Sequence, residues 1–258
     1  MGIKILVATH KEYEMPNSNI YLPIQVGAQG KESLGYTRDD TGENISKKNA
    51  NYCELTGLYW GYKNLENDYW GLVHYRRHFR SLKSNSKNKF SNIISENELL
   101  EILERYDVIL PKKQKYYIET LYSHYAHTHN EQDLRVTRDI IKRKYPEYIE
   151  SFDEVMKRKS AHMFNMFIMK KEFADKYCEW LFSILFELEK NIDIEEYDKF
   201  HARLFGRISE MLLDVWLDYN GLSYYELPVL FIGKIQWVRK IRAFLQAKFL
   251  GKKYESSF

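Results

Sequence analysis

The sequence predicts an α/β fold in which helices flank a single, mostly parallel β-sheet, with a more helical C-terminal half. Three observations lead to this class. A continuous apolar run opens the chain, apolar runs of strand length alternate with amphipathic segments up to residue 111, and long amphipathic segments follow residue 165. Continuous apolar runs are typical of strands covered on both faces, and the alternation of strand and helix is typical of parallel sheets.

The first strand is predicted at residues 3–8, just before Thr9 and His10. A polar loop follows, and its turn-forming residues concentrate at 38–44. Apolar residues from Tyr52 to Tyr62 then recur at helical spacing, which predicts an amphipathic helix. The second strand is expected to end at His74, where an apolar run gives way to charged residues.

Residues 81–92 are rich in Ser, Asn and Lys, and we expect a mobile loop there. Ser95 and Glu98 have the spacing of a capping box, which predicts a helix to about residue 105. A third strand is predicted at 107–111, where Pro111 stops it. In the second half we expect strands at 165–169 and 224–230, and helices at 171–189 and 207–219.

The composition is that of a soluble globular protein, because 44% of the 258 residues are hydrophobic and 29% are charged. No apolar run is long enough to span a membrane, and the N-terminus lacks the pattern of a signal peptide. Cys53 and Cys178 lie far apart, which predicts neither a disulfide framework nor a metal-binding spacing. We therefore expect a cytoplasmic protein.

The net charge of +3 hides a strongly basic C-terminus, since residues 234–253 hold seven basic residues and no acidic one. This distribution argues against nucleic acid as a partner of the whole protein. Apolar residues form a stripe along the same segment, with Trp237 beside it. A basic amphipathic helix with a tryptophan is typical of peripheral binding to an anionic membrane. The alternative is a helix that packs its apolar face on the protein. We expect a main domain at 1–232 and this helix and tail at 233–258.

The segment YWGLVHYRRHF at residues 69–79 is the most specific pattern in the chain. In open α/β sheets, ligands bind beyond the carboxyl ends of strands, and arginine pairs with phosphates and carboxylates. His74, Arg76 and Arg77 therefore predict an anion site. The alternative is an exposed basic turn, because neighbouring residues of a continuing strand point to opposite faces.

Two further clusters are weaker candidates. Asp40 and Asn44 lie in a glycine-containing turn that could bind a ribose or a base, although a plain surface turn has the same composition. Histidines 124, 127 and 129 precede Asp133, and without a known ligand spacing we interpret them as the lining of a polar pocket rather than a zinc site. Asp133 is also a candidate helix N-cap.

Glu210 follows Arg207 at the start of a predicted helix. A carboxylate in this place could act as a general base toward a hydroxyl group. The alternative is an electrostatic role, either toward the helix dipole or in an ion pair with Arg203 or Arg207.

Together these segments resemble a bacterial family of unknown function that occurs in capsular and exopolysaccharide biosynthesis clusters and whose members look like glycosyltransferases. The resemblance spans residues 3 to about 230, and the Gly-Leu-x-His-Tyr-Arg-Arg element in residues 69–79 is its specific motif. The matching segments are residues 40–46, 54–60, 69–79, 165–169 and 207–210.

The resemblance implies a GT-A-like fold with one Rossmann-type sheet, and a hexosyltransferase that uses a UDP-sugar, with galactofuranose or galactose as plausible sugars. Its acceptor would be a hydroxyl of a lipid-linked oligosaccharide at the inner face of the plasma membrane. Thr9, His10, Asp40 and Asn44 would hold the nucleoside. His74, Arg76 and Arg77 would bind the diphosphate. Glu210 or Asp133 would be the catalytic base.

Many GT-A enzymes hold Mn²⁺ or Mg²⁺ with an Asp-x-Asp motif after a strand, but here His74, Tyr75 and Arg76 occupy the corresponding place. This departure favours cationic side chains over a metal at the diphosphate, and no metal ligand is assigned. Coordination of a metal by His74 and a distant carboxylate remains the alternative. A second functional hypothesis is a catalytically inactive subunit that binds a nucleotide-sugar or assists assembly of a polysaccharide-synthesis complex.

Overall fold

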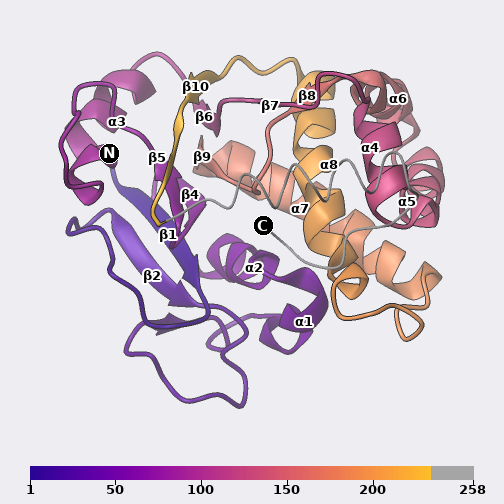
Figure 1. The fold of residues 1–258 in the computed structure, drawn as a ribbon, viewed down its shortest axis with the longest axis horizontal. Coiled ribbons are helices and arrows are strands. Elements are labelled where there is room, and N and C mark those ends of the chain that lie inside the picture. Colours follow the sequence, from indigo (N-terminus) through magenta and orange to yellow (C-terminus); the bar gives the residue numbers. More distant parts are fainter. Residues whose placement is uncertain (234–258) are drawn as a thin grey trace.

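The computed structural model describes residues 1–233. Its main sheet has the strand order β10-β6-β9-β4-β1-β2-β3, and β5 and β11 continue from β4 as an antiparallel extension (Figure 1). A separate two-stranded ladder joins β7 and β8. The strands are β1 (Ile3–Thr9), β2 (Tyr21–Gln25), β3 (Thr37–Arg38), β4 (Tyr69–His74), β5 (Arg77–Phe79), β6 (Val108–Pro111), β7 (Gln114–Lys115), β8 (Ser160–Ala161), β9 (Phe167–Lys170), β10 (Tyr225–Leu227) and β11 (Val229–Phe231).

The helices fall mostly in the second half of the chain, as the sequence predicts. They are α1 (Asn49–Tyr52), α2 (Leu55–Asn64), α3 (Glu96–Leu103), α4 (Leu121–Thr128), α5 (Glu131–Lys144), α6 (Ile149–Lys157), α7 (Lys171–Asn191) and α8 (Leu204–Asn220). In Figure 1, α4 to α8 form a large helical layer to one side of the sheet, while α3 lies on the opposite side.

The main sheet is parallel except at β9, which runs antiparallel to both of its neighbours, β4 and β6. β1 lies between β2 and β4 and pairs in parallel with both. The pairing of β4 with β9 explains the glycine of the YWGLVHYRRHF segment. A Cβ added at Gly71 would lie 2.0 Å from the carbonyl oxygen of Phe167 on β9, so only glycine fits there.

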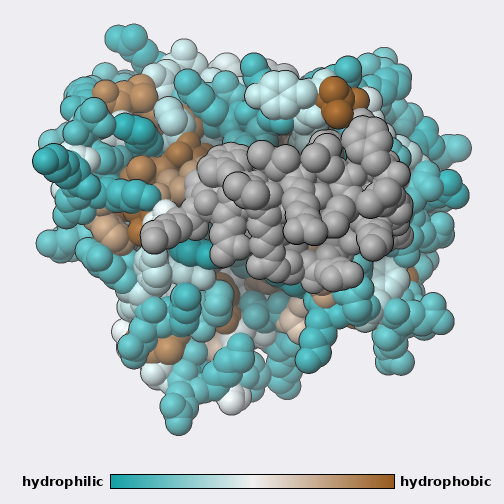
Figure 2. Space-filling model, viewed as in Figure 1, coloured by the Kyte–Doolittle hydropathy of each residue, from teal (hydrophilic) through white to brown (hydrophobic). Residues whose placement is uncertain are grey.

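Alternate residues of β1 pack into two different apolar cores, one on each face of the sheet. Leu6 and Ala8 face the larger core, which is formed with α2 and the C-terminal helices. Ile5 and Val7 face the smaller one, which includes residues of α3. Part of the apolar surface in Figure 2 gathers on the side where α3 and β5 lie. Burial on both faces explains why the strand is continuously apolar.

The predicted α/β class is confirmed for residues 1–233, as are the mostly parallel sheet and the flanking helices. The capping box of α3 is also present, with Ser95 and Glu98 in the expected roles. The segment that forms β2 was predicted to belong to the polar loop after β1, and its Pro23 is a residue that a central strand rarely contains. In the structure β3 pairs only with Ile24 and Gln25, so Pro23 faces no strand on that side of β2.

Two predicted local features differ from the structure. The single helix expected from Tyr52 to Tyr62 is broken into α1 and α2, because Cys53 has a left-handed backbone with φ of 54°. Helix α5 begins at Glu131 and is capped by Asn130, whose side chain accepts a hydrogen bond from the Gln132 N–H. The alternative assignment of Asp133 as N-cap is therefore wrong.

The basic segment predicted at residues 234–253 lies outside the described residues, so the proposed division between residues 232 and 233 stays a prediction. Within residues 1–233, no helix is both long and apolar enough to cross a membrane.

Candidate functional site

The arginines of the YWGLVHYRRHF segment lie on a tight hairpin. β4 ends at His74, the chain turns at Tyr75 and Arg76, and Arg77 begins β5 opposite His74. The strand does not continue through both arginines, and the two side chains enter different surroundings. Arg77 is largely buried, with its guanidinium 4.6 Å from the ring centre of Phe164. Arg76 is exposed and lies 5.3 Å from the ring centre of Tyr75.

Beside this hairpin, segments from four parts of the chain meet around two carboxylates. Asn165 donates from Nδ2 to Oε1 of Glu54 at 2.7 Å and to the carbonyl of Gly206 at 2.9 Å. The backbone N–H of Phe164 donates to Oε1 of Glu210 at 3.2 Å. The loop before β9 thus joins the start of α2 to α8. We call Glu54, His74, Arg77, Asn165 and Glu210 the inner site.

Strained backbone is concentrated at the inner site. Cys53, Phe164 and Asn165 all have positive φ angles, of 54°, 79° and 52°. Such conformations are uncommon outside glycine and persist only where surrounding contacts enforce them. Here they place Glu54 at the broken helix and turn the Phe164 carbonyl toward His74. Strain of this kind clusters at functional sites, which supports a functional role for this region.

Glu210 has the electrostatic character of a general base. Burial raises its pKa to about 7, and the nearby charge of Glu54 adds to this effect. The positive charges of Arg77 and Arg207 act in the opposite direction on the same pKa. A carboxyl group with a pKa close to neutral pH can accept a proton efficiently and also release it.

His74 is held as a neutral imidazole. Burial lowers its pKa, and Arg77 and Arg76 lower it further, against the opposing charge of Glu54. Its Nε2 lies 2.6 Å from the carbonyl oxygen of Phe164, and because a carbonyl only accepts, Nε2 carries the proton. The imidazole therefore orients the strained loop that carries Phe164 and Asn165.

Two further arginines lie near the inner site at the start of α8. Arg203 is the residue before the helix, and Arg207 and Glu210 follow at intervals of four and three residues, which places all three on one side. The Nε of Arg203 donates to Sγ of Cys53 at 3.0 Å, and the guanidinium of Arg207 lies 4.0 Å from the ring centre of Phe200. Arg203 and Arg207 lie close enough to Glu54 or Glu210 for the charges to affect one another.

A second group of cations surrounds His10, which follows β1. Its pKa is lowered, first by partial burial and then by the positive charges of Lys11, Arg76, Lys31 and Arg203. Among the described residues, Lys11, Lys31 and Arg76 form no ion pair with a carboxylate. We call His10, Lys11, Lys31 and Arg76 the outer cluster. An anion such as a diphosphate would relieve this concentration of positive charge.

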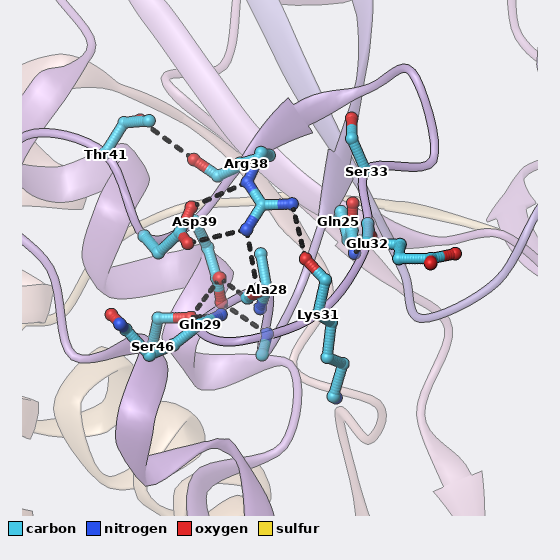
Figure 3. Close-up of polar contacts among 12 residues, drawn as sticks. Gln25, Ala28, Gln29, Lys31, Glu32, Ser33, Arg38, Asp39, Thr41 and Ser46 are labelled. Carbon is cyan, nitrogen blue, oxygen red and sulfur yellow. Dashed lines mark hydrogen bonds and ion pairs between the residues drawn. The ribbon is translucent and has the colours of Figure 1, made fainter.

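The loop that carries Lys31 is fixed by a network of hydrogen bonds, shown in Figure 3. The buried carboxylate of Asp39 accepts bonds from the N–H groups of Gly27 and Ala28 at 2.7 and 2.9 Å. The hydroxyls of Ser46 and Thr56 also donate to it. Arg38 extends the network by donating to the carbonyl oxygens of Ala28 and Lys31 and to Asp40.

Several predicted site residues come together here, and others do not. His10 and Arg76 lie in the outer cluster, and His74, Arg77 and Glu210 lie in the inner site. Thr9 is buried, and its hydroxyl donates to the carbonyl of Lys11 at 2.6 Å, which shapes the turn that presents His10.

The remaining predicted residues make other contacts. Asp40 pairs with Arg38, with Oδ2 at 2.7 Å from Nη2. Asn44 is bonded within its own turn, to Gly42 and Ser46. Asp133 is buried on α5 and accepts hydrogen bonds from the hydroxyls of Tyr125 and Tyr197, both at 2.7 Å.

The residues present do not fit a divalent metal at the end of β4. Side chains that follow the strand there are cationic or neutral, and hard divalent ions prefer clustered oxygen ligands. In the described part of the chain, no three His, Cys, Asp or Glu side chains are grouped so that they could hold a metal ion. His124 and His127 instead both contact the buried carboxylate of Glu119, at 3.0 and 2.9 Å.

Sequence reasoning missed Glu54, Asn165 and Arg203 as members of the site. Their roles depend on backbone angles at Cys53 and Phe164 that no periodicity reveals. One signal was present, since residues 54–60 and 165–169 are both segments that carry the family resemblance. The polar residues Glu54 and Asn165, which stand among mostly apolar residues in these two segments, were the signal that could have identified them as site residues.

Comparisons with known proteins identify the family and agree with the fold. The model of a protein family described as a domain of unknown function, DUF4422, matches residues 4–221. A solved structure titled as the apo form of WbbM, a bifunctional glycosyltransferase, superposes with a TM-score of 0.84 at 32% sequence identity. The match covers 91% of this chain and 46% of the WbbM chain, so this chain spans about half of that protein. No curated protein matches the sequence significantly. The fold is GT-A-like, as the sequence resemblance implied.

Proposed function

Because the chain belongs to the DUF4422 family, and because Glu210 stands among arginines at the carboxyl ends of β1 and β4, we propose that it is a glycosyltransferase. The reaction transfers a hexose, galactose or galactofuranose, from a UDP-sugar to a hydroxyl group of a lipid-linked oligosaccharide. The likeness to a bifunctional glycosyltransferase supports the general activity. The observation that carries the proposal is the position of Glu210, whose pKa is raised to about 7, near Arg77, on the same hairpin as Arg76 of the outer cluster.

The outer cluster binds the donor diphosphate. Arg76 is exposed at the hairpin, and its charge acts together with those of Lys11 and Lys31 on His10. A planar guanidinium can bind phosphate oxygens with two hydrogen bonds. The same cations stabilise the negative charge that develops on the departing UDP, so no metal is required for this step.

The inner site activates the acceptor. The acceptor hydroxyl oxygen forms a bond to the anomeric carbon and gives its proton to the carboxylate of Glu210. The bond between the anomeric carbon and the β-phosphate oxygen breaks, and UDP leaves with that electron pair. Arg77 lies on the hairpin, and its charge acts on both Glu54 and Glu210. Asp133 already accepts two tyrosine hydroxyls, which makes Glu210 the better base.

The activity can be tested by incubating the full-length protein with UDP-galactose, UDP-galactofuranose and UDP-glucose and measuring released UDP. We expect release from a galactose donor, and faster release when an oligosaccharide acceptor is added. If none of the donors is consumed while UDP still binds, the result would support the inactive binding subunit instead.

Arg76→Ala is expected to raise the KM for the UDP-sugar about tenfold or more while changing kcat less, because the lost guanidinium contacts the donor rather than the acceptor. The measurement is the dependence of initial rate on donor concentration. Arg80→Ala is a matched control, since Arg80 lies on the same segment and donates to the Asn85 side chain. Equal KM values for the Arg76 variant and wild type would remove Arg76 from the donor site.

The rate should depend on pH through Glu210. A base must be deprotonated, so kcat/KM is expected to rise as pH increases through about 7 and to level off above it. Because the charge of Glu54 raises the pKa of Glu210, Glu54→Gln should move this rise to lower pH. A profile measured for both proteins tests this, and a rise unchanged by Glu54→Gln would contradict the coupling of the two carboxylates.

A further inference from the structure

The loop between β7 and α4 presents two apolar side chains to solvent at one place on the surface. Tyr117 is 78% exposed and Ile118 is 59% exposed, and both belong to the small group of large apolar residues with high exposure in residues 1–233. In Figure 2 an apolar group stands out from the surrounding hydrophilic surface near β8 and α4. Contiguous exposed apolar surface is a feature of interaction sites.

The base of this loop is firmly held although its tip is exposed. The N–H of Tyr116 donates to the Lys159 carbonyl at 2.8 Å, and the N–H of Leu121 donates to the Arg158 carbonyl at 2.8 Å. Between these anchors Tyr117 has a φ of 56°, a left-handed conformation that is costly for a bulky residue. Anchored ends and an enforced strained tip indicate a loop that is built to hold Tyr117 and Ile118 outward.

Lysines flank the same loop. Lys112, Lys113 and Lys115 precede its tip in the chain, and the carbonyl of Lys159 accepts the hydrogen bond that anchors its base at Tyr116. The two residues before Lys159 are paired, Lys157 with Glu154 and Arg158 with Asp218. The four lysines, in contrast, form no ion pair with a carboxylate of the described residues. Lys113 lies 5.6 Å from the ring centre of Tyr224. The loop is therefore apolar at its tip, and the segment that leads to the tip and the base of the loop carry positive charge.

We propose that this patch, comprising Tyr117, Ile118 and the four lysines, docks on an anionic lipid bilayer. Aromatic and aliphatic side chains at a loop tip insert at the level of the lipid headgroups, and lysines around them are attracted to anionic lipids. Charge complementarity favours this occupant over an apolar protein surface. The docking site is separate from the inner site and the outer cluster, and it does not depend on the proposed transfer reaction.

The test is co-sedimentation of the full-length protein with phosphatidylcholine vesicles that contain or lack phosphatidylglycerol. Wild type should bind the anionic vesicles and be released by salt. The double variant Tyr117→Ser with Ile118→Ser, and a variant with the four lysines changed to Glu, should each lose about fivefold or more of the partition coefficient. Leu82→Ser, whose side chain is also 59% exposed, and Lys87→Glu are controls that should bind as wild type does.

Hydrogen exchange provides a second readout at the loop itself. Amides of residues 116–119 should exchange more slowly when anionic vesicles are present, whereas those of residues 82–88 should not. Equal partition of all variants with unchanged exchange would overturn the proposal. Loss of a concentration-dependent dimer in the Tyr117 and Ile118 variant, with vesicle binding intact, would also overturn it and assign the patch to a protein interface. UDP release from a soluble acceptor assay should be unaffected in every variant.

Discussion

Glu210→Gln is expected to reduce the rate of sugar transfer by about 10³-fold while the dissociation constant for UDP stays within about twofold of the wild-type value. The amide oxygen can still accept the hydrogen bond that the Phe164 N–H donates to the carboxylate at 3.2 Å. An amide cannot take a proton from the acceptor hydroxyl, however. The geometry of the strained loop should therefore persist while the chemistry is lost.

The measurements for this variant are single-turnover transfer and calorimetric UDP binding. Glu196→Gln serves as the control, because Glu196 is an exposed glutamate outside the site. Unchanged turnover of the Glu210 variant would remove it from the role of base and direct attention to Glu54. A parallel loss of UDP binding would instead show that the substitution disturbs the donor site.

Asp39→Ala is expected to lower the free energy of unfolding by about 3–5 kcal/mol, because removing one partner of a buried charged network leaves the others uncompensated. Asp39 is completely buried and accepts hydrogen bonds from two backbone N–H groups and two hydroxyls. Within the described residues, the Gly27 and Ala28 N–H groups donate their hydrogen bonds to Asp39 and to no other acceptor in this network. The loop that carries Lys31 would also lose its fixed conformation, so donor binding should weaken as well.

Urea and thermal unfolding measure this loss, and a decrease in the melting temperature of about 10 °C is expected for a domain of this size. Asp40→Ala is the matched control, because Asp40 is the next residue but pairs with Arg38 nearer the surface, with side-chain exposures of 25% for Arg38 and 15% for Asp40. Asp40→Ala should lower the free energy of unfolding much less than Asp39→Ala does. Equal destabilisation by the two substitutions would contradict the central position given to Asp39.

The strand–helix framework could be predicted because burial leaves a direct trace in the sequence. β1 packs apolar residues into both cores, and its apolar run is unbroken except at Lys4. The capping box at Ser95 is a similar local signal. β2 left no such trace, because Pro23 interrupts it at a place where β3 does not extend. The reversed direction of β9 also depends on long-range pairing that local sequence does not encode.

The site was partly predictable because the apolar runs of buried elements show where polar side chains interrupt or follow them. The end of β4 pointed to His74, Arg76 and Arg77, and a turn there was the alternative, but the returning strand that begins at Arg77 was not predicted. Glu210 was found as a polar residue at the start of an apolar helix. Glu54 could not be assigned, because its position depends on the left-handed Cys53 that breaks an apparently continuous helix. Tertiary contacts, rather than local propensity, determine that break.

The proposed function requires a nucleotide-sugar site at the carboxyl ends of β1 and β4, and calorimetric titration of the full-length protein with UDP tests this requirement most directly. We predict binding in the micromolar range that Arg76→Ala abolishes or greatly weakens, and equal affinity with and without Mn²⁺. Absence of UDP binding under both conditions would contradict the donor site. Binding that requires Mn²⁺ would contradict the assignment of diphosphate neutralisation to the outer cluster alone.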